Sequence, residues 1–118
     1  MVRSFGTMKL NPTLRQKKRY VLFEVQSLTH FSMSEVKEEV EQALQRFFGI
    51  WGMAYASPQF VSESFQDKTQ RFVVKVNHTF VDELRMGIIL SKNIKNTPVL
   101  IRSLLTSGTL KTIRKYHS

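Results

Sequence analysis

The sequence predicts an α+β domain in which four strands and two helices follow the order β-α-β-β-α-β. Two observations lead to this prediction: some segments alternate residues with the period of a strand, and others repeat apolar residues with the spacing of a helix. The chain has 118 residues, of which 42% are hydrophobic. This length and composition suit a single domain built around one core.

Four segments have the composition of strands, because β-branched and aromatic residues fit a pleated, half-buried surface. They are residues 19–28 (RYVLFEVQSL), 50–64 (IWGMAYASPQFVSES), 71–77 (RFVVKVN) and 99–105 (VLIRSLL). Gly52 and Pro58 interrupt the second segment, and Pro58 removes a donor from the ladder. That strand is therefore expected to be broken.

Two segments have the spacing of amphipathic helices. In residues 32–49, Ser32 and Glu35 form a capping box at the start, and Gly49 is placed to end the helix. Residues 79–94 form the second helix. The apolar residues of each segment recur every three or four positions, which predicts one buried stripe on each helix.

This order of elements is the split β-α-β arrangement of ferredoxin-like or RRM-like domains, a sandwich of one antiparallel sheet with both helices on one face. The opposite face of the sheet is then open, and strand alternation places a candidate apolar patch on it. The patch consists of Leu22, Val73, Leu100 and Leu104. A patch of this kind is rarely left bare, so we expect a protein partner, a second copy or the C-terminal segment to cover it.

The last residues of the chain predict a short basic helix over residues 109–116. Thr109 can cap it, and Leu110 and Ile113 fall on one side. The cations on the other side are Lys111, Arg114 and Lys115. The helix is therefore expected to present a basic surface that an apolar contact holds against the domain.

Positive charge is concentrated at the two ends of the chain. The net charge is +9, residues 1–20 carry six cations, residues 84–118 carry seven, and all nine acids lie between these segments. We interpret residues 1–16 as a flexible basic arm and residues 17–118 as the ferredoxin-like domain. A nearly neutral body with basic ends is typical of proteins that bind polyanions, nucleic acid above all, although a merely solvated basic surface is the alternative.

The residues give little support for catalysis by the chain alone. There is no cysteine to act as a nucleophile or zinc ligand, and the three histidines, His30, His78 and His117, lack the spacing of metal ligands. Glycines do not cluster before a helix, as a phosphate-binding loop requires. We therefore predict no catalytic residue, no metal site and no cofactor on the protein.

The absence of cysteine favours a cytoplasmic location, since secreted proteins commonly carry disulfides. No apolar run reaches the ~20 residues that span a bilayer, so no membrane partner is expected. Residues 1–20 are basic and free of acids, as organellar transit peptides are, and this remains a minor alternative.

Four motifs, in this order and spacing, resemble a known family. They are LRQKKRYVLFEV, FFGIWGMA, TQRFVVKV and SGTLKTIRKY. The chain resembles the small protein subunit shared by archaeal and eukaryotic ribonuclease P, called protein component 2 in archaea. The resemblance covers nearly the whole chain.

The resemblance implies an RNA-binding subunit that is not an enzyme alone but helps a catalytic RNA to remove the 5′ leader of precursor tRNA. The RNA, with Mg2+, does the chemistry, and precursor tRNA is contacted indirectly. The implied protein partners are a barrel-shaped second subunit and a second copy of this chain, in a complex of two plus two. The residues implied to contact RNA are Arg15, Lys17, Lys18, Arg19, Thr109, Lys111, Arg114 and Lys115.

A second function stays open at this stage. The same fold serves as a protein-interaction or small-ligand regulatory module, in which the open face of the sheet would carry the function and the basic termini would be incidental. Recovery of a bound RNA from cells would distinguish the two hypotheses.

Overall fold

The computed structural model describes residues 17–117, so the predicted arm at residues 1–16, including Arg15, lies outside the described part of the chain. Its strands and helices are β2 (Lys18–Gln26), α1 (Met33–Ala56), β3 (Gln59–Phe60), β4 (Arg71–Asn77), α2 (Val81–Ile89), β5 (Asn93–Ile94), β6 (Thr97–Pro98), β7 (Leu100–Ser107) and α3 (Leu110–His117). Short 3-10 turns occur at Ser62–Ser64 and His78–Phe80.

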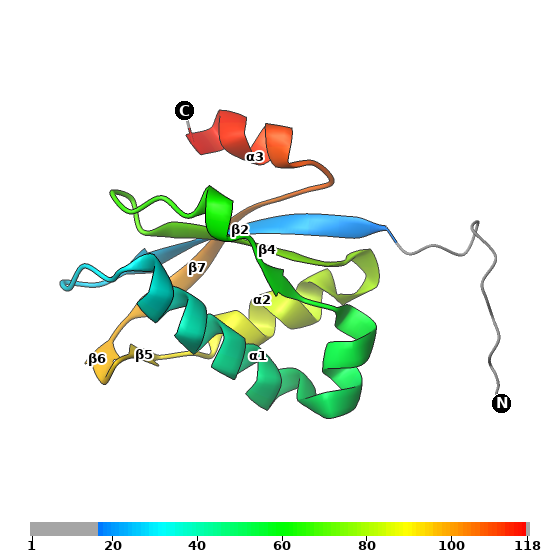
Figure 1. Ribbon diagram of the computed structural model, residues 1–118, viewed down its shortest axis with the longest axis horizontal. Coiled ribbons are helices and arrows are strands. Elements are labelled where there is room, and N and C mark those ends of the chain that lie inside the picture. The colour runs from blue at the N-terminus through cyan, green and yellow to red at the C-terminus, as the bar shows by residue number, and fades with distance from the viewer. Residues whose placement is uncertain (1–16, 118) are drawn as a thin grey trace, which may run out of the picture.

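The sheet confirms the predicted ferredoxin-like fold. Its strands lie in the order β3-β4-β2-β7, and every neighbouring pair is antiparallel. Helices α1 and α2 cover one face of the sheet, and α3 lies on the opposite face (Figure 1). The last strand thus returns beside the first, as the split β-α-β arrangement requires.

The main core lies between the sheet and the two long helices. Phe23, Phe72 and Phe60, from three neighbouring strands, stack in a row with ring centroids 5.2 and 5.6 Å apart. The helices bury their apolar stripes against this row, and the residues that do so are Val36, Val40, Leu44, Leu84 and Ile88. Strand alternation thus directs Phe23 and Phe72 toward the helices, opposite to Leu22 and Val73.

The start of α1 is the predicted capping box. The Ser32 hydroxyl accepts a hydrogen bond from the Glu35 backbone N–H at 3.3 Å, and the Glu35 carboxylate accepts one from the Ser32 backbone N–H at 2.9 Å. Each bond satisfies a polar group that a helix start leaves without an intrahelical partner.

The first helical segment of α1 does stop at Gly49, as predicted, but the strand expected after it is wrong. Gly49 has φ 69° and ψ −174°, which interrupts the helix, but residues 50–56 then continue as helix up to Ala56. A Cβ at Gly49 would meet nothing within 4 Å, so glycine is needed there for its backbone conformation and not for space. The second strand is accordingly only Gln59–Phe60, much shorter than predicted.

The second helix is also shorter than predicted, because α2 ends at Ile89. The next residues form a small hairpin of β5 and β6. Its turn residues, Lys95 and Asn96, have φ of 51° and 66°, as a two-residue turn of type I′ demands.

Candidate nucleic-acid interface on the sheet and C-terminal helix

Helix α3 covers the face of the sheet that α1 and α2 leave open (Figure 1). The Thr109 hydroxyl accepts a hydrogen bond from the Thr112 backbone N–H at 3.4 Å, which confirms Thr109 as the cap. Ile113 is completely buried in a second apolar cluster with Leu22 and Val73, and Leu110 packs against the same cluster. The predicted apolar contact between the C-terminal helix and the domain is therefore present.

This contact with α3 covers part of the predicted apolar patch and so removes it from the surface. Leu22 and Val73 are completely buried, and Leu104 is half-buried against them, whereas Leu100 is 61% exposed and lies outside the cluster. Of the three covers that we considered, the C-terminal segment is the one present. Because the chain itself buries Leu22 and Val73, the prediction of a protein interface remains open only at Leu100 and at the edge formed by Leu104.

A β-bulge explains why two consecutive leucines of β7 approach this cluster. The pairing of β2 with β7 shifts between Leu22 and Phe23, so that Leu22 pairs with Leu105 while Phe23 pairs with Ser103. Leu104 is the additional residue, and both leucines pack on the cluster. Simple strand alternation predicted Leu104 there but not Leu105.

The far end of α3 is held by a polar group on the sheet. The Arg71 guanidinium carbon lies 5.5 Å from the centroid of the Tyr116 ring, a cation–π contact. Glu24 joins Arg71 to Arg102, with a distance of 3.1 Å from Arg71 Nε to Glu24 Oε2 and 2.8 Å from Arg102 Nη2 to Glu24 Oε1. Burial raises the pKa of Glu24, but the hydrogen bonds and charges of Arg102 and Arg71 outweigh it and lower the pKa below 4.5.

Sequence reasoning missed this group, although a signal for it existed. Glu24 pairs across the strands with Arg71 on one side and with Arg102 on the other. Opposite charges at directly paired positions stabilise a sheet, so aligning the three predicted strands would have revealed the group.

The predicted RNA-contacting residues come from the two ends of the described chain, and the fold brings these ends together. Strand β2 begins where β7 ends, because Tyr20 pairs with Ser107. The side chain of Arg19 lies so close to Gly108 that a Cβ there would sit 2.9 Å from a guanidinium nitrogen. The start of β2 and the start of α3 thus share one end of the sheet, which we call the basic end (residues 17–19 and 107–111).

The exposure of these side chains suits contact with a large partner. Those that are exposed are Lys17, Arg19, Thr109, Lys111, Arg114 and Lys115, and Lys18 is half-buried. Lys111, Arg114 and Lys115 follow one another along the outer side of α3, while Ile113 faces the sheet. Exposed cations therefore occur both at the basic end and along the outer side of α3.

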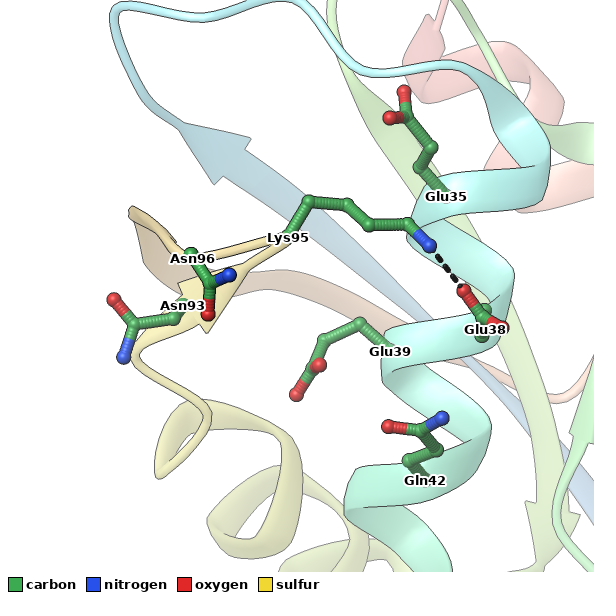
Figure 2. Close-up of a pocket in the computed structure, with 7 residues that line it drawn as sticks. All are labelled: Glu35, Glu38, Glu39, Gln42, Asn93, Lys95 and Asn96. Carbon is green, nitrogen blue, oxygen red and sulfur yellow. Dashed lines mark hydrogen bonds and ion pairs between the residues drawn. The ribbon is translucent and has the colours of Figure 1, made fainter.

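The helical layer offers a different kind of surface. A hollow of about 310 Å³ between α1 and the β5–β6 hairpin is lined by Glu35, Glu38, Glu39, Gln42, Asn93, Lys95 and Asn96 (Figure 2). Lys95 Nζ lies 2.7 Å from Glu38 Oε1, and this hydrogen bond, with the Glu38 charge, raises the pKa of Lys95. Among residues 17–117, no three histidine or acidic side chains are grouped closely enough to hold a metal ion.

The fold and the basic end together define a class of protein, a ferredoxin-like domain with a candidate nucleic-acid interface beside a docked C-terminal helix. Within the described residues, no helix has the length and apolar character needed to cross a membrane.

Comparison with known proteins identifies the family. The family model for the Rpp14/Pop5 family matches residues 19–118. Ribonuclease P protein component 2 of Pyrococcus abyssi is 36% identical over 106 residues, which cover 90% of this chain and 88% of the relative. The protein of the same name from Pyrococcus horikoshii is 32% identical over 115 residues, covering 98% and 92%. The chain therefore belongs to the Rpp14/Pop5 family, and by this membership it is a protein subunit of the ribonuclease P type.

One solved structure shows the same fold. A chain in the cryo-EM structure of yeast ribonuclease MRP matches with a TM-score of 0.63 and 16% identity, covering 87% of this chain and 92% of that one.

Proposed function

We propose that this chain is an RNA-binding subunit of ribonuclease P that supports the catalytic RNA in removing the 5′ leader of precursor tRNA. Its archaeal relatives carry the name of a ribonuclease P component. The observation that carries the RNA-binding part is the basic end, where Lys17 and Arg19, at the start of β2, share one end of the sheet with Thr109 and Lys111, at the start of α3. Cations from two distant parts of the chain gathered at one end can neutralise closely spaced phosphates.

Helix α3 would act as a platform for part of this surface. It has eight residues, and an isolated helix of that length is marginal in water. Ile113 of α3 is buried against the sheet, and this contact would hold the helix in place. Docking would therefore order Lys111, Arg114 and Lys115. Ordered cations lose less entropy when they meet a phosphate than those of a free tail do.

In this proposal the chemistry belongs to the RNA and its bound Mg2+. The protein supplies positive charge around the RNA, and it contacts precursor tRNA only indirectly. The complex would work in the cytoplasm, the location that the absence of cysteine favours.

Protein partners would bind elsewhere, on the helical layer. Ile50, Trp51 and Tyr55, which follow the break at Gly49, are 87%, 76% and 60% exposed. Exposed tryptophan and tyrosine are typical of the residues that contribute most to protein interfaces. We propose this segment as the contact for the barrel-shaped second subunit or for a second copy of the chain, in a complex of two plus two.

The test is recovery of RNA from cells with a tagged chain, followed by sequencing. We expect ribonuclease P RNA to dominate the recovered material, and adding the purified chain to a reconstituted reaction should raise cleavage of precursor tRNA. A matched variant in which Lys17, Lys18 and Arg19 are alanine should recover less of the same RNA. If no RNA is enriched, the regulatory-module hypothesis is favoured instead.

A further inference from the structure

A row of polar side chains crosses three neighbouring strands at the basic end, on the face of the sheet that carries α3. Tyr20 of β2 pairs with Lys75 of β4, and Lys75 pairs on its other side with Gln59 of β3. Residues paired in this way point to the same face of a sheet and lie side by side. The row therefore places an aromatic ring, an ammonium group and a carboxamide next to each other.

These three side chains line a hollow that α3 does not fill. Its volume is about 190 Å³, and its walls are Tyr20, Gln59, Phe60, Val61, Glu63, Lys75 and Leu110. Leu110 belongs to α3, so the docked helix forms one wall. At about 30 Å³ per water molecule, the hollow has room for roughly six waters, which suits one planar ring better than a base pair.

The hollow is open to a ligand from outside. Tyr20 and Lys75 are half-buried, whereas Gln59 and Glu63 are exposed. Tyr20 also packs against the cluster of Leu22, which fixes the position of its ring. A rigid aromatic ring at the side of an accessible hollow is a surface on which a flat ligand can stack.

The chemistry of the walls favours a nucleobase over a phosphate group. The Gln59 carboxamide both donates and accepts hydrogen bonds, and the Glu63 carboxylate accepts them from ring N–H or amino groups. The negative charge of Glu63 would repel a phosphate inside the hollow. Lys75 and the nearby Lys18 can instead pair with the phosphate of a nucleotide whose base has entered.

We propose that this hollow binds one unpaired nucleobase of RNA, stacked on Tyr20 and read along its edge by Gln59 and Glu63. The proposal rests on the RNA-binding function above and adds a base contact to its phosphate contacts. It differs from stacking on the third strand of the common RNA-recognition module, because Phe72 is completely buried toward the helices. The contact would favour single-stranded segments, since a paired base cannot leave its stack without cost.

The test compares Tyr20→Leu with Tyr20→Phe and with Phe47→Leu in the full chain. Tyr20→Leu keeps an apolar side chain but removes the ring, Tyr20→Phe keeps the ring, and Phe47→Leu removes a partly exposed ring from α1 on the helical layer. The probes are labelled single-stranded RNA hexamers of each base and a short RNA duplex. Circular dichroism melting of each variant shows whether it is folded.

We expect Tyr20→Leu to bind the hexamers about 5- to 150-fold more weakly, the loss typical of one stacked base, with an unchanged salt dependence. Tyr20→Phe and Phe47→Leu should bind as the wild type does, and duplex binding should change little in all three. Gln59→Ala with Glu63→Gln should reduce the differences in affinity among the four hexamers. Ultraviolet cross-linking of the wild-type chain to ribonuclease P RNA should give an adduct on the peptide that contains Tyr20.

The proposal is overturned if Tyr20→Leu binds the hexamers as tightly as the wild type, if the folded Tyr20→Phe variant loses as much affinity, or if the wild type binds the duplex but no hexamer. These results would leave the proposed function standing as long as the wild type still binds ribonuclease P RNA. Failure of the wild type to bind that RNA would instead count against the proposed function itself.

Discussion

The two faces of the sheet carry helices of opposite character. On one face, α3 buries its isoleucine and exposes three cations with no acid. On the other, α1 and α2 carry six acids and three cations, and the segment after Gly49 exposes Ile50 and Trp51. One layer therefore presents charge suited to a polyanion, and the other presents apolar side chains suited to a protein.

This difference shows that a docked helix can replace an apolar sheet face with a basic surface. Helix α3 buries the apolar residues Leu22 and Val73, so no partner can reach them, and the same contact holds a line of cations above them. Changes placed on one layer should therefore affect RNA binding, and equal changes on the other should affect protein binding.

Replacing Ile113 with alanine should have the largest effect. Truncation of a completely buried isoleucine costs about 2–5 kcal/mol, and a helix as short as α3 cannot stay folded without its docking contact. We expect the amides of residues 110–117 to exchange with solvent much faster and RNA affinity to fall. Ile50→Ala, on the helical layer, is the control and should change stability by less than about 0.5 kcal/mol. Wild-type protection of α3 in the Ile113 variant would contradict this account.

Replacing Lys111, Arg114 and Lys115 together with alanine should come next. Losing three phosphate contacts should weaken RNA binding on the order of 10²-fold at physiological salt, and the log-log salt slope should flatten by roughly one unit per contact. The fold should survive, since exposed charges contribute little to stability. The control removes the same charge from the helical layer, through Lys37, Lys92 and Lys95, and should leave the slope nearly unchanged. Equal slopes for both variants would mean that the cations of α3 add only to the overall charge and do not contact phosphates.

Replacing Trp51 with alanine should affect protein binding alone. Truncation of a central interface tryptophan commonly weakens association by about 2 kcal/mol or more, which is about 30-fold. Titration calorimetry with the proposed barrel-shaped subunit, and sedimentation of the chain by itself, would show which association loses affinity. RNA binding should stay at the wild-type level, and Tyr116→Ala, on α3, is the matched aromatic control. If Trp51→Ala changes neither association, the helical layer is not the protein interface.

Much of the fold followed from local patterns in the sequence. The capping box of Ser32 and Glu35 could be predicted because both hydrogen bonds lie within four residues. The docking of α3 could be predicted because Leu110 and Ile113 are spaced for one side of a helix. Each of these features depends on residues that are neighbours along the chain.

The parts that escaped prediction depend on backbone conformation or on pairing between distant segments. The helix break at Gly49 was predicted, but the second helical segment after it was not, because the apolar composition of residues 50–56 favoured a strand. The β-bulge beside Leu22 moved Leu105 toward α3. The row of Tyr20, Lys75 and Gln59 exists only through the registers of three strands, so no single segment of sequence could indicate it.

The smallest effect should come from removing one carboxylate charge from an ion pair on each side of the sheet. Only the loss of the Glu24 charge, on the face that carries α3, should change stability, and this change should depend on pH. The arginines that flank Glu24 lower its pKa below 4.5, so its charged form stabilises the fold above that pH, and the contribution is lost as pH falls through the lower pKa of the folded state. Glu24→Gln should thus reduce stability by roughly 1–2 kcal/mol at pH 7, because three charged hydrogen bonds from Arg71 and Arg102 are weakened, and the difference from wild type should shrink toward pH 3. Glu38→Gln, which breaks the exposed pair with Lys95, should have no measurable effect at either pH. Thermal unfolding of both variants at pH 7, 5, 4 and 3 measures this, and a Glu24 deficit that stays constant across the series would mean that its carboxylate acts through packing and not through charge.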